Sequence, residues 1–394
     1  MQQIVFLDSD TLDTGINLRR PDFPHHWQSY PETKPEQVVE RLRCASIAII
    51  NKVRIGADEL AQLPELRLIA LAATGSDNLD LEACRAANVA VCNIRNYSGP
   101  SVPEHAMALM LALSRNLFAW RQSLQEGRWQ QSGQFCFFDH PIMDLHGKRL
   151  GIIGKGTLGQ ALGQRAGAIG MEVFYAQSQV GAPGDEDRLP LESLLQSSDV
   201  ISLHCPLTPY TRHLIGEREL AMMKPGALLI NVGRGGLVDE QALLEALGNG
   251  RLGGAGFDVA SVEPPPPDHP LMQALRYPNF ILTPHVAWAS EESMQRLADQ
   301  LIDKINAFAL GRRQHRLAPP QPQGGQQQKP QQHATRRALF QQTVKPGHTR
   351  QQAGHPPRGQ PPGRQGHPQR ISAQRPAAVR SPIRFHAASR PASA

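Results

Sequence analysis

Acidic residues are missing from the last 83 residues of this 394-residue chain. The segment from Arg312 to Ala394 contains 15 Lys or Arg, 16 Gln and 13 Pro, and no Asp or Glu. Such a composition buries too little apolar surface to offset the loss of chain entropy on folding. We expect a disordered basic tail that binds polyanions only non-specifically, through counterion release. A reading frame entered after a frameshift in GC-rich DNA would give the same mixture, so the tail's origin stays open.

Long apolar runs and paired cysteines are also missing. No stretch of 18 apolar residues occurs, and the N-terminal MQQIVFLDSD has an apolar run of four residues with no basic region before it. Neither a membrane helix nor a secretory signal is therefore expected. The five cysteines include no CxxC pair, which argues against a disulfide framework and a structural zinc site. We expect a cytoplasmic protein without a metal centre.

The body of the chain, residues 1–311, carries 26 basic and 35 acidic residues. The basic excess of the whole chain therefore belongs to the tail. An acidic body gives no support for a nucleic-acid-binding core. Its length suits about two domains.

Short apolar segments rich in Val, Ile and Leu alternate with helical patterns through the body. Such alternation is typical of a parallel, doubly wound sheet. A first series of strands is expected at 4–7, 45–50, 66–73 and 89–93. A long apolar helix follows, from Val102 to about Leu124. The second series is expected at 149–154, 173–176, 200–205, 227–232, 254–259 and 280–284.

Two α/β domains follow from this order, with a boundary near residue 100. A last helix, from about Ser290 to Leu310, begins with a capping pattern and could fold back onto the first unit. We expect a discontinuous, flavodoxin-like substrate domain of residues 1–100 and 286–311, a dinucleotide-binding Rossmann domain of residues 101–285, and the tail at 312–394. Ligands should lie in the cleft between the two domains.

A glycine-rich turn, Gly154-Lys155-Gly156-Thr157-Leu158-Gly159, joins the strand RLGII to a helical segment. In that context the glycines permit a tight turn and close backbone approach, while the helix N-terminus faces a pyrophosphate. Glycine turns also simply join strands to helices, so the motif alone is weak evidence. With strand, helix and following strand in place, it predicts a site for NAD or NADP.

The next strand ends at Ala176-Gln177, without the acidic residue that usually holds the ribose 2′-hydroxyl of NAD. A missing carboxylate removes the repulsion that would exclude the 2′-phosphate of NADP. No Arg follows nearby in the sequence to bind that phosphate. The choice between NAD and NADP is therefore open.

Three segments stand at the ends of strands in the second series, where polar groups face a ligand. They are His204-Cys205-Pro206, Val232-Gly233-Arg234 and Phe257-Asp258. Arg234 has the fork geometry to bind a substrate carboxylate through two hydrogen bonds. The plainer alternative is a surface Arg at a strand end, although the flanking glycines leave this one accessible.

His285 ends the last strand of the second series, in Thr-Pro-His-Val-Ala-Trp. A histidine there can exchange a proton with a substrate hydroxyl or carbonyl, because histidine ordinarily titrates near neutral pH. A nearby carboxylate would orient the ring, and Glu263 is the candidate. We take the other 14 histidines as structural, which is the commoner role.

Seven motifs stand out along the body: AATGSDNLDL (72–81), SVPEHAMALML (101–111), GIIGKGTLG (151–159), HCPLTPYTRHLI (204–215), MKPGALLINVGRGGLVDE (223–240), GFDVASVEPPPPDHPL (256–271) and TPHVAWAS (283–290). Together they resemble the D-isomer-specific 2-hydroxyacid dehydrogenases over nearly all of residues 1–311. The pairing of VEPPPPDHPL with TPHVAWAS is most similar to the glycerate dehydrogenase and hydroxypyruvate reductase branch.

The resemblance implies a catalytic Arg, Glu and His at Arg234, Glu263 and His285. It implies that backbone groups of Ala73, Thr74 and Gly75 help to hold the substrate carboxylate. It also implies that Asp258 lies beside the nicotinamide and that the long helix from Val102 builds a homodimer. The expected cofactor-binding residues are Gly154, Gly156, Thr157, Leu158, Gly159, Gln177, Cys205, Pro206, Val232, Gly233 and Asp258.

We therefore expect an oxidoreductase that uses NAD or NADP to interconvert a small D-2-hydroxy acid, such as D-glycerate, with its 2-oxo acid. One alternative is a nicotinamide-sensing interaction protein of the co-repressor type. Another is a family enzyme that acts on phosphoglycerate, formate or lactate. The tail contains no recognisable regulatory domain, which argues against a long-form phosphoglycerate enzyme.

Overall fold

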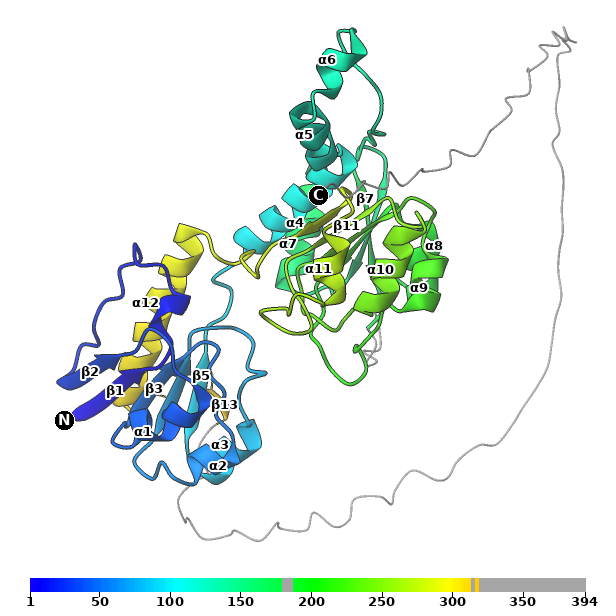
Figure 1. Cartoon of the computed structure of the whole chain (residues 1–394). Coiled ribbons are helices and arrows are strands. Elements are labelled where there is room, and N and C mark those ends of the chain that lie inside the picture. The colour runs from blue at the N-terminus through cyan, green and yellow to red at the C-terminus, as the bar shows by residue number, and fades with distance from the viewer. Residues whose placement is uncertain (179–186, 313–315, 319–394) are drawn as a thin grey trace, which may run out of the picture. The chain divides into compact units, whose positions relative to one another are not determined.

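Two α/β units with separate sheets make up the part of the chain that the structure, a computed structural model, describes: residues 1–178, 187–312 and 316–318 (Figure 1). The expected fold class of two parallel-sheet domains is confirmed for these residues. Their central strands are largely apolar because a parallel strand covered on both faces presents no polar side. Within the same ranges, no helix has the length and apolar character needed to cross a bilayer.

The first sheet has the strand order β13-β5-β4-β3-β1-β2. Its strands are β1 (Gln2–Phe6), β2 (His25–Ser29), β3 (Ile47–Ile50), β4 (Leu68–Leu71), β5 (Ala90–Asn93) and β13 (Arg316–Ala318). Its short helices are η1 (Ser9–Thr11), η2 (Pro35–Gln37), α1 (Val38–Leu42), α2 (Ala57–Leu60) and α3 (Leu81–Ala86). Every residue of β3, β4 and β5 is buried, so these strands form the centre of the unit.

The last long helix, α12 (Glu291–Ala309), packs on one face of this first sheet. Leu297, Leu301 and Ile305 bury their side chains among residues of β1, β3 and β4. The Ser290 hydroxyl caps the helix by accepting a hydrogen bond from the Ser293 N–H at 3.2 Å, which confirms the capping pattern. This packing supports the discontinuous substrate domain, whose boundaries stay a prediction.

The segment expected to be wholly disordered contains a short strand. β13 pairs antiparallel with β5, so that Arg316 lies opposite Cys92. Leu317 packs against the core between the first sheet and its helices, and this burial together with the open edge of β5 accounts for the pairing. The expectation for residues 313–315 and 319–394 lies outside the described residues, whereas for Arg316–Ala318 it was wrong.

The second sheet is parallel throughout, in the order β12-β11-β10-β9-β6-β7-β8. Its strands are β6 (Arg149–Ile153), β7 (Glu172–Ala176), β8 (Arg188–Leu189), β9 (Val200–Leu203), β10 (Leu228–Asn231), β11 (Gly254–Phe257) and β12 (Phe280–Leu282). One face packs on α4 (Ser101–Ser114) and α7 (Thr157–Ala168), and the other on α8 (Leu191–Ser197), α9 (Glu217–Met222), α10 (Glu240–Gly248) and α11 (Pro270–Ala274). The chain reverses strand order beside β6, where ligands bind in such sheets.

The long helix expected from Val102 to about Leu124 is broken. After α4 the chain turns at Asn116, whose φ of 51° is left-handed, and its side-chain amide bonds to the Pro141 carbonyl. The chain continues as α5 (Leu117–Gln125) and α6 (Arg128–Ser132). In Figure 1 these two helices project from the second unit as an arm, which we call the α5–α6 arm (residues 117–142).

Candidate active site

The glycine turn at the end of β6 has the close packing that a dinucleotide site requires. Gly154 has a φ of 111°, and a Cβ there would lie 2.6 Å from the Cys205 nitrogen. A Cβ on Gly159 would lie 2.0 Å from the Gly154 carbonyl oxygen, so α7 starts directly against the turn. By contrast, a Cβ on Gly156 would meet nothing within 4 Å. The turn therefore leaves open space at the N-terminus of α7, where Thr157 and Leu158 begin the helix, and a pyrophosphate fits there.

The residue at the end of β7, Gln177, has an arginine beside it that the sequence did not indicate. Gln177 is exposed and its N–H donates to the Leu189 carbonyl at 2.8 Å, which places β8 beside it. Arg188 therefore lies next to Gln177, with the Gln177 amide 3.5 Å from the Arg188 carbonyl. The expectation that no Arg is near was wrong, because Arg188 is 11 residues away in sequence and reaches Gln177 only through the pairing of β7 with β8.

The loop after β9 contacts both the glycine turn and the loop after β10. A Cβ on Gly233 would lie 3.2 Å from the Leu203 carbonyl and 3.4 Å from the Cys205 carbonyl. Asn231 fixes the second loop, since its amide donates to the Arg234 carbonyl at 3.0 Å and accepts from the Gly233 N–H at 3.1 Å. Burial raises the pKa of the Cys205 thiol to about 11, so the thiol is uncharged at neutral pH and lines the site without acting as a nucleophile. Pro206 and Val232 complete the loops.

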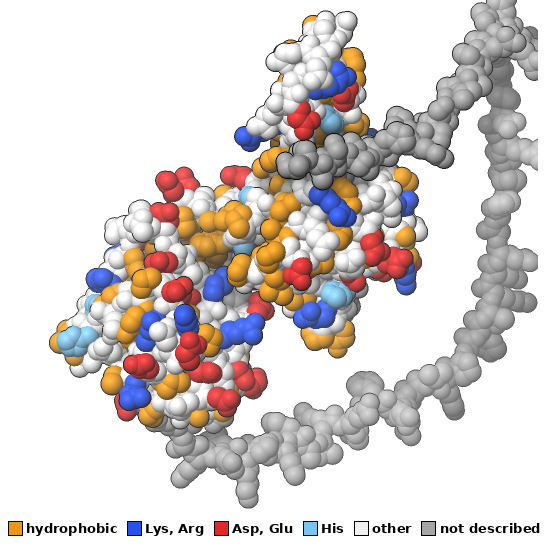
Figure 2. Space-filling model, in the orientation of Figure 1, with side chains coloured by type: hydrophobic (Ala, Val, Ile, Leu, Met, Phe, Trp, Pro, Cys, Tyr) orange, Lys and Arg blue, Asp and Glu red, His pale blue; other side chains and the backbone are white. Residues whose placement is uncertain are grey.

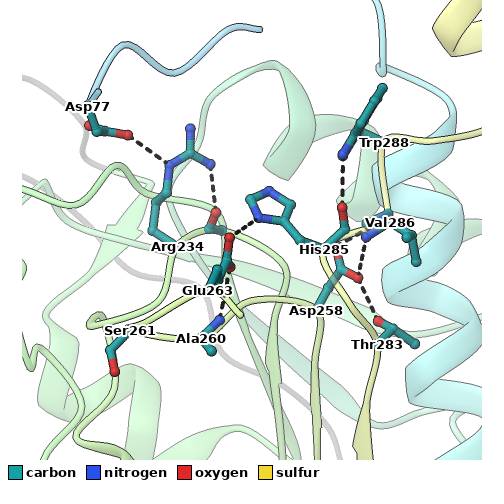
Figure 3. Close-up of polar contacts among 12 residues, drawn as sticks. Asp77, Arg234, Asp258, Ala260, Ser261, Glu263, Thr283, His285, Val286 and Trp288 are labelled. Carbon is teal, nitrogen blue, oxygen red and sulfur yellow. Dashed lines mark hydrogen bonds and ion pairs between the residues drawn. The ribbon is translucent and has the colours of Figure 1, made fainter. Parts of the chain in front are cut away.

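Arg234 contacts the loop that the resemblance assigns to substrate binding. A Cβ on Gly75 would lie 2.3 Å from Arg234 Nη2, so the guanidinium packs against this glycine. Its Nε lies 3.4 Å from Asp77 Oδ2, and its Nη1 donates to the Gly233 carbonyl at 2.8 Å (Figure 3). The guanidinium is held through Nε and Nη1 and keeps further N–H donors for a ligand.

The loop at Ala73, Thr74 and Gly75 is held from behind. The Thr74 hydroxyl donates to the Ile94 carbonyl, and the Asn93 amide donates to the Thr74 carbonyl, both at 2.7 Å. In the part of the chain that the structure describes, neither the Thr74 N–H nor the Gly75 N–H donates to a protein acceptor. Two backbone donors are therefore available beside Arg234.

Glu263 and His285 form a direct pair, with His285 Nδ1 2.7 Å from Glu263 Oε2 (Figure 3). The other carboxylate oxygen accepts from the Ala260 N–H at 3.1 Å. Burial raises the pKa of Glu263, but the hydrogen bond and charge of His285, the Ala260 N–H and the charge of Lys52 outweigh it and lower the pKa below its ordinary value. The carboxylate is ionised at neutral pH, and the ring is held by Nδ1 with Nε2 left for other chemistry.

Asp258 supports the turn that carries His285. Its carboxylate is 1% exposed and accepts from the N–H groups of Val286 and Ala287, both at 2.9 Å, and from the Thr283 hydroxyl at 2.6 Å. These bonds hold His285 at a left-handed φ of 56°. The placement of Asp258 beside a nicotinamide stays a prediction, while its support of His285 is observed.

Lys52 is a charged neighbour of the site that the sequence did not single out. Its N–H, with those of Asn51 and Val53, donates to the Asp8 carboxylate after β3. Loss of hydration lowers the pKa of Lys52 although the residue is partly exposed; Glu263 opposes this effect and Arg234 adds to it. The only signal in the sequence was its place directly after a buried strand.

Comparisons with known proteins agree with this geometry. Residues 107–287 match the family model of the D-isomer specific 2-hydroxyacid dehydrogenase, NAD binding domain. The chain is 50% identical over 317 residues to the glycerate dehydrogenase of Methylorubrum extorquens, covering 80% of this chain and 98% of the relative. It is 37% identical to a hydroxypyruvate reductase of Blautia hydrogenotrophica, over 71% of this chain and 87% of the relative.

Solved structures show the same fold. The NADPH-dependent glyoxylate/hydroxypyruvate reductase of Sinorhizobium meliloti superposes with a TM-score of 0.69 at 27% identity, over 81% of this chain and 98% of that one. A glycine turn shaped for a dinucleotide, an ionised carboxylate on a histidine and an arginine at one set of strand ends are the parts that reversible hydride transfer to a 2-oxo acid needs. The chain belongs to the family of D-isomer-specific 2-hydroxyacid dehydrogenases and is an NAD(P)-dependent oxidoreductase.

Proposed function

We propose that the protein interconverts D-glycerate and hydroxypyruvate. The observation that carries this proposal is the 2.7 Å contact of His285 Nδ1 with Glu263 Oε2 at the strand ends that also hold Arg234. The relatives named glycerate dehydrogenase and hydroxypyruvate reductase support this choice of substrate.

The substrate carboxylate is bound by Arg234 and by the backbone of Ala73, Thr74 and Gly75. Arg234 packs against Gly75, and the N–H groups of Thr74 and Gly75 need an acceptor. A carboxylate satisfies both sets of donors and neutralises the guanidinium charge. A carboxylate bound there lies beside the loop that carries Asp77, which contacts Arg234.

His285 holds and moves the proton of the reaction. Because Glu263 fixes Nδ1, the ring exchanges a proton through Nε2 with the C2 oxygen of the substrate. The glycine turn and the N-terminus of α7 would hold the pyrophosphate of a dinucleotide, and Cys205, Pro206, Val232 and Gly233 would line the rest of its site. When bound, the dinucleotide would supply or accept the hydride at C2.

Both forms of the cofactor are accepted in this proposal. No carboxylate stands at Gln177 to repel a 2′-phosphate, and Arg188 lies beside it on the neighbouring strand. Lys155, in the glycine turn, places its ammonium 5.3 Å from the centre of the Tyr175 ring on β7. These cations favour tolerance of NADP in addition to NAD.

The active form is a homodimer in this proposal, built with the α5–α6 arm. Apolar side chains are exposed along the arm, among them Phe118, Phe135 and Phe138, and Figure 2 shows such side chains on its surface. Exposed apolar side chains gathered on one projecting element are typical of a protein interface. A second copy of the chain is the partner. The cytoplasmic location stays a prediction from the sequence.

The proposal is tested by following oxidation of NADH and NADPH with hydroxypyruvate, glyoxylate, pyruvate and phosphohydroxypyruvate. Hydroxypyruvate should give the highest kcat/KM. The His285→Ala variant should lose turnover by at least about a hundredfold while NADH still quenches protein fluorescence. Near-normal turnover of this variant would exclude the mechanism. Absence of turnover with every acid would favour the nicotinamide-sensing alternative, which the enzyme relatives do not favour.

A further inference from the structure

A buried polar cluster lies behind Glu263, formed by Glu240, Ser261 and His269. Glu240 is 8% exposed and His269 is 7% exposed, unusual values for charged or titratable side chains. Glu240 is the first residue of α10, and His269 precedes α11. Ser261 stands two residues before Glu263, between β11 and the pair with His285.

All three side chains meet at the Glu240 carboxylate. The Ser261 N–H donates to Glu240 Oε1 at 2.8 Å, and the Ser261 hydroxyl donates to Oε2. His269 Nε2 lies 3.1 Å from Glu240 Oε2 and 3.1 Å from the Ser261 hydroxyl. His269 Nδ1 accepts from the Leu271 N–H at 3.3 Å, so the neutral ring carries its proton on Nε2 and donates it into the cluster. Three donors therefore satisfy one buried carboxylate.

The cluster holds the backbone segment from which Glu263 extends. The Ala260 N–H donates to Glu263 Oε1 at 3.1 Å, so the residue directly before Ser261 supports this carboxylate (Figure 3). The same segment presses on the residue after Arg234, since a Cβ on Gly235 would lie 1.8 Å from the Ala260 carbonyl oxygen. A shift of Ser261 would therefore move Glu263 relative to His285.

We propose that Glu240, Ser261 and His269 are positioning residues that hold the Glu263 carboxylate against His285 Nδ1. They act through Glu263 and do not touch the substrate. The inference rests on the proposed function, in which the Glu263–His285 pair transfers the proton. Substitution of one of these positioning residues should therefore lower kcat without a matching change in KM or in cofactor affinity.

The test is a double-mutant cycle between Glu240→Gln and Glu263→Gln, measured as kcat for hydroxypyruvate. Glu240→Gln keeps the shape of the side chain but replaces an acceptor oxygen by an amide N–H, which faces the donors of Ser261 and His269. Alone it should lower kcat at least about tenfold, because displacement of a catalytic group by about 1 Å costs on the order of a hundredfold. In the Glu263→Gln background it should have no further effect.

Ser261→Ala provides a milder variant that keeps the backbone bond to Glu240, and Glu245→Gln is the matched control. Glu245 lies on the same helix and is exposed, and among the described residues its carboxylate accepts a hydrogen bond only from Gln241. Ser261→Ala should lower kcat in the same sense and by less, and Glu245→Gln should leave it within twofold. Equal losses of kcat from Glu240→Gln in both backgrounds would overturn the proposal, as they would show a role independent of Glu263.

Crystal structures of the wild type, Glu240→Gln and Glu245→Gln separate this inference from the proposed function. In Glu240→Gln the distance from His285 Nδ1 to Glu263 Oε2 should lengthen beyond hydrogen-bond range, while the control keeps the bond. An unchanged contact in Glu240→Gln would overturn the inference even if hydroxypyruvate is turned over. A lengthened contact in an enzyme that turns over none of the acids would support the inference and contradict the proposed function.

Discussion

At the scale of single residues, Arg234 owes its position to the absence of a side chain on Gly75. A methyl group at residue 75 would lie 2.3 Å from Nη2 and must displace the guanidinium. Gly75→Ala should therefore raise KM for hydroxypyruvate at least about tenfold, because one bidentate contact to the carboxylate is lost. Steady-state kinetics and NADH fluorescence titration measure the effect, and NADH affinity should stay unchanged.

Gly99→Ala is the control for this variant. It adds the same methyl group in a loop of the first unit, where the nearest atom would be 3.9 Å away. Its KM should match that of the wild type. If Gly75→Ala leaves KM within twofold, the proposed contact of Arg234 with the carboxylate is wrong.

Glu263 makes a pH-dependent contribution to stability. Its pKa is lower in the folded protein than the ordinary value of 4.5, because the contacts of His285 and Ala260 outweigh burial. An acid with a lowered folded pKa stabilises the fold above its unfolded pKa and loses this contribution as pH falls through the folded pKa. The Tm of the wild type should exceed that of Glu263→Gln between pH 6 and 7, and the difference should shrink below about pH 4.5.

Thermal unfolding followed by fluorescence at a series of pH values measures this difference. Val262→Ala, which changes an exposed neighbour of Glu263 that does not titrate, should shift Tm by the same amount at every pH. A Tm difference for Glu263→Gln that grows as the pH is lowered would contradict the stated sign.

The sequence pointed to candidate site residues at strand ends, and missed candidates that only tertiary contacts bring together. Arg234 and His285 could be inferred because each stands three residues after the end of a strand. Glu263 lies in a loop and needed the resemblance, since the bond to His285 spans 22 residues. His269 was taken as one of many structural histidines, because its partner Glu240 is 29 residues away and only the fold brings them together.

At the scale of elements, apolar runs predicted the buried central strands but not the strands at the edges of the sheets. β2 has the sequence HHWQS and no residue in it is fully buried, so it is positioned by pairing with β1 and by the packing of Trp27 against the core. β13 is three residues in a polar context, and β8 is two. Asn116 broke the long helix because its side chain bonds to Pro141, a contact across 25 residues that helix periodicity does not report.

The α5–α6 arm carries the prediction that belongs to this scale. Phe135 and Phe138 are 89% and 87% exposed, so Asp in place of both should leave the fold of one chain intact. Two charges in an apolar interface each cost several kcal/mol, and the dimer should dissociate. Light scattering coupled to gel filtration should give the mass of a dimer for the wild type and of a monomer for the variant.

Asp in place of Tyr210 is the control, because this aromatic residue is also exposed but lies outside the arm. Its mass should remain that of a dimer. A wild type that elutes as a monomer at micromolar concentration would refute the proposed assembly, and an unchanged mass in the double variant would place the interface elsewhere.

At the scale of the whole molecule, the residues of the proposed site come from both sheets. The first sheet contains the loop at Gly75, and the second contains the strand ends of Arg234 and His285. The relative from Methylorubrum extorquens is covered over 98% of its length by 80% of this chain. We therefore expect the chemistry to need little beyond the body of the chain.

Two truncations test this division, one that ends at Ala318 and retains β13, and one that ends at Gly311 and removes it. The longer truncation should keep kcat and Tm, because the contacts that build the proposed site are made by residues 8–288 and β13 is retained. The shorter should keep kcat within twofold but lose a few degrees of Tm. The reason is that Leu317 no longer covers the core beside β5, a burial worth about 1–2 kcal/mol.

Both truncated proteins should elute from heparin at lower salt than the full chain, since most of the 15 basic side chains of the tail are gone. A large loss of kcat in the longer truncation would show that the tail takes part in catalysis or in the fold, and equal Tm values for the two would show that β13 adds nothing to the sheet.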